Sequence, residues 1–101
     1  MVKKGKFSEP SLLILISLAE TNRHGYAIME DIQQTYDIQL GPGTLYGAIS
    51  RLEKAGYIRV IESEERKKPY TLTKAGSEHL TQQIEELQKI TMLGSKRLGL
   101  L

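Results

Sequence analysis

The 101-residue chain has no cysteine, no tryptophan and no long apolar run. Without cysteine, neither a disulfide nor a thiolate-ligated metal site can form, which fits the reducing cytoplasm. The longest apolar run, Leu12 to Ile16, is too short to cross a bilayer. Three lysines precede this run, as in a secretory signal, but Pro10, Glu20 and the lack of a small-residue cleavage site argue against that alternative. We therefore expect a cytoplasmic protein with no membrane partner.

Catalytic and metal-binding patterns are also missing from the sequence. His24 and His79 lie far apart and neither has a carboxylate at a metal-ligand spacing. Glu30 and Asp31 are adjacent, and neighbours on a helix point apart, so they cannot act as an acid/base pair. No serine stands in a recognisable nucleophile turn. The sequence therefore predicts no metal, no cofactor and no enzymatic activity.

Charge is uneven along the chain, although the net charge is only +2. Residues 20–40 hold one cation and four carboxylates, a net −3, whereas residues 41–60 hold three cations and one carboxylate, a net +2. The first ten residues hold three lysines and one carboxylate, which is again +2. Positive charge therefore gathers at the start of the chain and in residues 41–60, where contact with a polyanion is most favoured.

Hydrophobic spacing and turn residues predict four helices and one β-hairpin. Helices should span about 10–22, 24–36 and 42–55 and begin again after residue 73, and strands should span 57–62 and 69–72. Pro42 suits a first helical position, Gly56 suits a helix end, and Thr73 suits an N-cap. The expected fold class is mainly α with a small β-hairpin (α+β).

The first and last helices are candidates for dimerisation. The first is apolar on all sides, so a second subunit should cover the part that its own domain cannot; the alternative is a central core helix within one chain. Apolar residues of the last helix follow a heptad seam, although the sequence does not decide whether the helix continues past Gly94. The predicted dimerisation residues are Leu12, Leu13, Leu15, Ile16, Leu80, Ile84, Leu87, Thr91 and Leu98.

The helix at 42–55 has the shape expected of a DNA-reading helix. Leu45, Ile49 and Leu52 share its apolar side. Its opposite side carries small residues near the start and cations near the end, so it can lie deep in a major groove. Tyr46 and Tyr26 are either packing residues or contacts beside the groove. The predicted DNA-binding residues are Tyr26, Gly43, Thr44, Tyr46, Gly47, Ser50, Arg51, Lys54 and the hairpin cations Arg66, Lys67 and Lys68.

Several short motifs resemble the PadR family of bacterial transcriptional regulators. The resemblance covers roughly residues 10–80 and rests on His24-Gly25-Tyr26, Pro42-Gly43-Thr44-Leu45-Tyr46, Arg51-Leu52-Glu53, Gly56 to Ile58, and Tyr70 with Leu72-Thr73. It implies a winged helix-turn-helix with one C-terminal dimerisation helix. It also implies a homodimeric repressor that binds pseudo-palindromic, double-stranded operator DNA, with a small lipophilic or phenolic effector at the dimer interface. On this basis we expect a flexible basic arm at 1–7, a DNA-binding domain at 8–72 and a dimerisation helix at 73–101.

Three departures from the family pattern bear on function. Gly47 stands where a proline is common, Gly41 stands where a serine cap is common, and the wing residues 62–68 carry three carboxylates and three cations, a net charge of zero. The contribution of the wing to DNA binding is therefore open. Two alternatives remain: a winged-helix regulator of another family, and a winged-helix adaptor that binds protein and not DNA.

Overall fold

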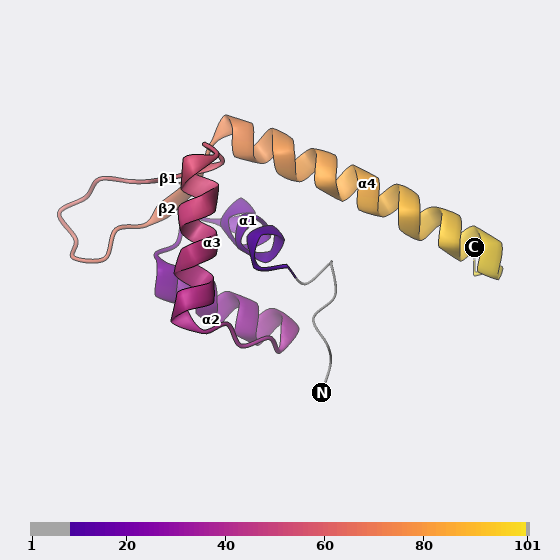
Figure 1. Ribbon diagram of the computed structural model, residues 1–101, viewed down its shortest axis with the longest axis horizontal. Helices are drawn as coiled ribbons and strands as arrows, with labels where there is room; N and C mark the ends of the chain where they lie inside the picture. The colour runs from indigo at the N-terminus through magenta and orange to yellow at the C-terminus, as the bar shows by residue number, and fades with distance from the viewer. Residues whose placement is uncertain (1–8, 101) are drawn as a thin grey trace.

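The computed structural model describes residues 9–100 and confirms a mainly α fold with one small hairpin (Figure 1). In chain order the elements are α1 (Pro10–Glu20), α2 (Gly25–Tyr36), α3 (Pro42–Lys54), β1 (Ile58–Val60), β2 (Tyr70–Leu72) and α4 (Lys74–Leu98). The strands pair antiparallel, with Ile58 opposite Leu72 and Val60 opposite Tyr70. The predicted basic arm at 1–7 lies outside the described residues.

Local capping chemistry sets the ends of the helices. The Oγ1 atom of Thr73 accepts a hydrogen bond from the Gly76 N–H at 3.0 Å and so caps α4. Gly56 has a φ of +81° after α3, and the following N–H, of Tyr57, donates to the Leu52 carbonyl at 3.0 Å. This pairing is the Schellman arrangement, in which a left-handed glycine lets the chain turn back on the last helical carbonyls. His24 caps α2 because its Nδ1 accepts from the Ala27 N–H at 3.3 Å.

α1 lies at the centre of the core of a single chain. It packs against α2, α3, α4 and β2, and Leu12, Leu13 and Leu15 are only 6%, 3% and 1% exposed. The structure therefore corrects the argument that this all-round apolar helix requires a second subunit, because the other elements of its own chain already cover these leucines. Ile16 is half-buried and is the member of the predicted α1 set that keeps some open surface.

The link between α1 and α2 extends the hairpin by one bridge. The Arg23 N–H donates to the Tyr70 carbonyl at 3.3 Å, and the Tyr70 N–H donates to the Arg23 carbonyl at 2.8 Å. This pairing needs extended backbone, so α1 ends at Glu20 and not near residue 22 as the sequence suggested. The Arg23 guanidinium also forms ion pairs with Glu20 and Asp31, which join the same link to both flanking helices.

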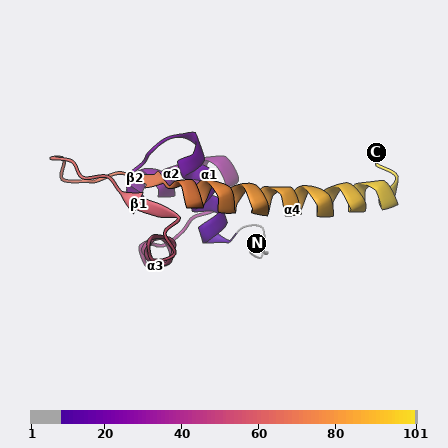
Figure 2. The same cartoon turned by 90° about the horizontal axis from the view of Figure 1, so that it is seen from above.

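α4 runs out of the globular part of the molecule on the side opposite the wing (Figures 1 and 2). The longest dimension is 54 Å, and the radius of gyration is 15.1 Å, against about 13 Å for a compact chain of 100 residues. Leu80 is buried in the core, whereas the side chains beyond Leu87 are exposed, apart from the half-buried Ser95. The helix continues past Gly94 and ends at Leu98, which settles the point that the sequence left open.

Candidate nucleic-acid interface

α3 has one buried side and one open side. Leu45, Ala48, Ile49 and Leu52 are buried in the core. On the other side, Gly47 is half-buried and the exposed residues are Gly43, Thr44, Tyr46, Ser50, Arg51, Lys54 and the carboxylate Glu53. Figure 2 views the helix end-on and shows it at one edge of the molecule. A helix at the edge can enter a groove without a clash from the rest of the chain.

The small residues Gly43 and Gly47 on the open side of α3 leave room for the side chain of Arg51. A Cβ placed on Gly47 would lie 3.7 Å from a terminal guanidinium nitrogen of Arg51, so the arginine side chain lies back along α3 over this glycine. Gly43 has open space around it. Neither Arg51 nor Lys54 forms an ion pair among residues 9–100. Both cations are therefore available to bases or phosphates.

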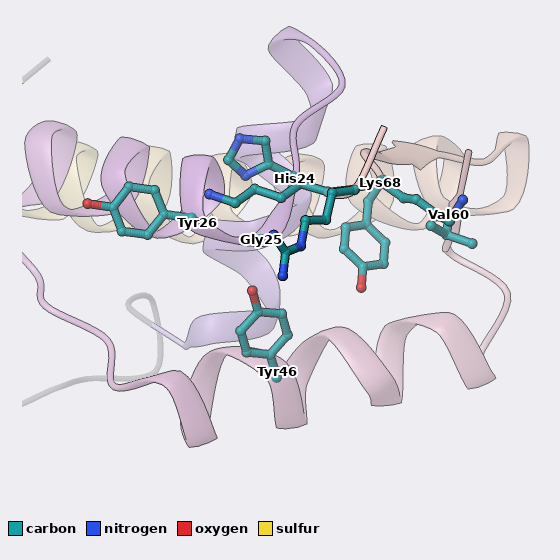
Figure 3. A pocket seen from close by; sticks show the side chains of 9 residues that line it. His24, Gly25, Tyr26, Tyr46, Val60 and Lys68 are labelled. Carbon is teal, nitrogen blue, oxygen red and sulfur yellow. The ribbon is translucent and has the colours of Figure 1, made fainter. Parts of the chain in front are cut away.

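Tyr46 fits both interpretations that the sequence allowed. Figure 3 shows it rising from α3 with its hydroxyl pointing at Gly25, the first residue of α2. A Cβ on Gly25 would meet two Tyr46 ring carbons at 2.7 Å, so a side chain at position 25 requires the tyrosine ring to move. The ring is nevertheless 49% exposed. Tyr46 thus packs on the start of α2 while it presents an edge to a ligand beside α3.

A cavity of about 330 Å³ lies between the start of α2, Tyr46 and the wing (Figure 3). Its lining combines aromatic rings with cations, a composition that suits an anion or a polyanion backbone. The lining residues are His24, Gly25, Tyr26, Tyr46, Val60, Arg66, Lys67, Lys68 and Tyr70. Five predicted DNA-binding residues are therefore brought together here: Tyr26, Tyr46, Arg66, Lys67 and Lys68.

The three wing cations differ in their surroundings. Lys68 Nζ donates to the Ser63 carbonyl at 2.7 Å and pairs with a Glu62 carboxylate oxygen at 3.3 Å. Lys67 Nζ lies 5.7 Å from the centre of the Tyr26 ring, within cation–π range. In the described part of the chain, Arg66 and Lys67 pair with no carboxylate. Although the wing has no net charge, Arg66 and Lys67 therefore line the cavity without a carboxylate partner among residues 9–100.

Tyr70 adds a neutral hydroxyl to the cavity. Partial burial raises the pKa of Tyr70 above its ordinary value of 10.0, and the negative charge of Glu53 and the neighbouring Tyr46 raise that pKa further. The hydroxyl therefore stays protonated at neutral pH and can donate a hydrogen bond. Sequence reasoning missed Tyr70 as a lining residue, along with His24, Gly25 and Val60. The only available signal was the presence of His24, Gly25 and Tyr70 in the motifs quoted above.

Two further observations limit other functions. No helix within residues 9–100 is long and apolar enough to span a membrane. No cluster of histidine and acidic side chains in the same range could hold a metal ion.

Comparison with known proteins places this arrangement in a family. The model of the transcriptional regulator PadR-like family matches residues 14–82. An uncharacterised 37.1 kDa protein of a Streptomyces fradiae transposon, TN4556, is 38% identical over 84 residues. That match covers 83% of this chain and 24% of the transposon protein, so the chain spans about a quarter of its relative's length.

Solved structures agree with the family match. A transcriptional regulator from Clostridium thermocellum, Cth-833, is 30% identical with a TM-score of 0.79, over 94% of this chain and 97% of that one. A PadR family regulator from Clostridium difficile R20291 is 26% identical with a TM-score of 0.79, over 88% and 97% of the two chains. Halobacterial RosR, from H. salinarum, is 21% identical with a TM-score of 0.70 and shares the fold. Given the family-model match over residues 14–82 and the agreement of the fold, the chain belongs to the PadR-like family of transcriptional regulators, whose members are not enzymes.

Proposed function

We propose that the protein is a cytoplasmic repressor that binds pseudo-palindromic, double-stranded operator DNA as a homodimer. The observation that carries the proposal is the open side of α3, at the edge of the fold, where small residues stand beside two cations that form no ion pair within residues 9–100. An adaptor that binds another protein would more typically present apolar anchors there. Among the exposed residues of this side of α3, Tyr46 is the only aromatic one and none is a large aliphatic one.

Each part of the interface has a role that follows from its position. Thr44, Ser50 and Arg51 lie where they can reach base edges once α3 enters the major groove, and Lys54 near its end is placed for a phosphate. The cavity beside Tyr46 can hold the sugar-phosphate backbone next to that groove, with Arg66 and Lys67 supplying charge. The wing then adds affinity that depends on salt and not on sequence.

The distal half of α4 supports the homodimer. Leu98 is 76% exposed and Ile90 is 59% exposed, so this stretch shows the solvent apolar side chains that its own chain does not cover. Leu80 is buried in the core of its own chain, and Ile84 and Leu87 pack against that core, so the sequence placed these three in the dimer seam too early. Thr91 and Leu98 continue the same side of the helix at heptad spacing and are exposed. A second copy of α4 laid against this side would bury both seams, as obligate dimers require.

An effector site has one structural candidate. A groove of about 380 Å³ lies between the end of α1, β2 and α4 and includes Leu72, Leu80 and Ile84 among its lining residues. It lies on the same helix as the proposed dimer seam, so a small lipophilic or phenolic molecule could be enclosed there by the second subunit. Because the chain has no tryptophan, such a ligand cannot stack on an indole ring.

The test is an affinity measurement on two kinds of DNA. A duplex that carries the promoter upstream of the protein's own gene is titrated at several salt concentrations, beside a scrambled duplex of equal length. We expect tighter binding to the promoter, footprint protection of two half-sites about one helical turn or a whole number of turns apart, and a steep salt dependence. Equal, weak binding to both duplexes would overturn the proposal and favour the adaptor.

A further inference from the structure

The start of α4 is fastened to the end of α3, although the wing separates them in sequence. The Oγ1 hydroxyl of Thr73, at the N-cap of α4, donates to the Gly56 carbonyl at 2.6 Å. The Thr73 N–H donates to the Tyr57 carbonyl at 3.0 Å. Figure 1 shows that α4 begins beside this end of α3. The proposed reading helix and the proposed dimerisation helix therefore meet directly at residues 56, 57 and 73.

Side-chain stacking strengthens the same junction. The ring of Tyr57, which follows α3, stacks on the ring of His79 in the second turn of α4, with centroids 4.2 Å apart and ring planes 8° apart. Both side chains are half-buried. Two flat rings in contact resist tilting, because any change in the angle between their helices opens the stack or forces an atomic overlap.

The helix backbone itself is in contact at this point. A Cβ on Gly76 would overlap the Tyr57 carbonyl oxygen and lie 2.8 Å from the carbonyl carbon. Gly76 is buried, so α4 lies directly on the Tyr57 peptide group with no side chain between them. The glycine, the capping threonine and the stacked rings thus hold the α4 axis to the end of α3 over its first two turns.

Small rotations at this junction matter because α4 is long. At 1.5 Å per residue its 25 residues extend about 37 Å. A rotation of about 5° at one end would move the other end by about 3 Å, close to the ~3.4 Å rise of one base pair. In a dimer joined through α4, such a rotation changes the separation of the two reading helices by a similar amount.

We propose that the Tyr57–His79 stack is a positioning device that sets the half-site spacing that the dimer accepts. This inference rests on the proposed function, because it requires a dimer with two DNA-reading helices. It goes further by assigning spacing specificity to two residues that lie on neither the reading side of α3 nor the cavity. His79 and Tyr57 act through the angle between α3 and α4.

Removal of the stack should broaden spacing tolerance without weakening the binding of each half-site. A duplex is first selected from a random-sequence library with the wild-type protein. Two derivative duplexes then carry one base pair more or one base pair fewer between the half-sites. A third derivative duplex carries a single half-site. For the wild type we expect about tenfold weaker binding after either change in spacing. For His79→Ala we expect less than about threefold weakening, with single-half-site affinity unchanged.

Two controls separate positioning from general damage. His79→Phe keeps a flat ring on Tyr57 and should restore the spacing preference of the wild type. Glu78→Ala alters an exposed neighbour on the same turn and should behave as wild type. Tyr57→Leu, which removes the stack from the other side, should reproduce His79→Ala.

The outcomes distinguish this inference from the proposed function. Failure of the wild type to select any duplex would overturn DNA recognition itself, and the inference with it. Selection of half-sites at no fixed spacing would leave DNA binding intact and overturn the inference. So would an unchanged spacing preference in both His79→Ala and Tyr57→Leu. Loss of cooperative unfolding in both variants would also overturn it, because the stack would then hold the fold and not the angle.

Discussion

Two uncovered surfaces of the molecule differ in chemistry. The open side of α3 is slim, polar and cationic, with glycines at 43 and 47 and unpaired cations at 51 and 54. The distal half of α4 presents Ile90, Leu93 and Leu98 to solvent. A polar surface loses little by staying in water, as suits the reversible DNA contact proposed for it, whereas burial against the proposed second subunit would stabilise an exposed apolar stretch.

The comparison indicates that exposure alone does not identify a binding surface; the chemistry of the exposed groups does. α3 lacks the apolar anchors of a protein interface, and α4 beyond Leu87 has one cation, Lys89, before the pair Lys96 and Arg97 in its last turn. We therefore expect substitutions on α4 to change assembly and substitutions on α3 to change DNA discrimination. The following predictions test whether assembly and DNA discrimination are in fact assigned to different helices.

Leu98→Asp should have the largest effect and should act on assembly. It places an unpaired charge in the proposed seam and should raise the dimer dissociation constant by roughly 30-fold or more, equivalent to about 2 kcal/mol. Analytical ultracentrifugation measures this constant. Lys89→Asp, on the opposite side of the same helix half, is the matched control and should leave the dimer intact. A Leu98→Asp protein that stays dimeric at low micromolar concentration would contradict the assignment.

Arg51→Ala should act on discrimination and leave assembly unchanged. Loss of a base-reading arginine should cost about 1–3 kcal/mol per half-site and relax preference at one position. Fluorescence anisotropy with operator and single-base variants gives both quantities. Arg97→Ala removes an equal charge at the far end of α4 and is the control. If the two variants weakened binding equally, Arg51 would act only as a charge, and α3 would not be the reader.

Lys67→Ala should have a smaller effect that is equal for all DNA sequences. Without this lysine each protomer neutralises one phosphate fewer, so the log–log salt slope should flatten by about 0.9 per protomer, or about 1.8 for the dimer. Lys68→Ala is the matched comparison, because Lys68 is already paired with Glu62 and should change the slope less. A change in sequence preference with Lys67→Ala would show that the wing reads bases as well.

Tyr70→Phe should give the smallest effect, visible only in alkali. The folded pKa of Tyr70 is raised above 10.0, mainly by burial. Its contribution to stability is therefore fully present below about pH 10 and is lost as pH rises through the folded pKa. Denaturant unfolding from about pH 9 to about pH 11 should show a shallower fall for Tyr70→Phe than for wild type. Tyr26→Phe, an exposed ring at the same cavity, is the control, and an identical fall in all three proteins would contradict the assignment.

Sequence patterns located most helix ends because capping is local chemistry. Pro42, Gly56 and Thr73 each act through atoms within a few residues, and each stands where it was predicted. The separation of the α3 surface into buried and open sides also followed from spacing alone. The end of α1 did not, because it depends on the pairing of Arg23 with Tyr70, far along the chain.

Interactions between distant segments account for the rest of what sequence reasoning missed. His79 was considered as a metal ligand and rejected, and its stack on Tyr57 depends on how α4 meets α3. The leucines of α1 were assigned to a dimer because the sequence does not show how completely one small domain can enclose a central helix. The sequence also did not show which wing cations are paired, because the ion pair between Lys68 and Glu62 depends on the conformation of the loop.

The contact between Tyr46 and Gly25 links two positions that any engineering effort would treat as independent. No side chain fits at position 25 while the tyrosine ring occupies its place at 46. A combinatorial library that randomises position 25 alone should therefore favour glycine and the smallest residues among functional clones, because anything larger must displace the Tyr46 ring. A library that randomises both positions should also return larger residues at 25, each paired with a shortened residue at 46. The surface beside α3 can thus be redesigned, but only by changing the two helices together.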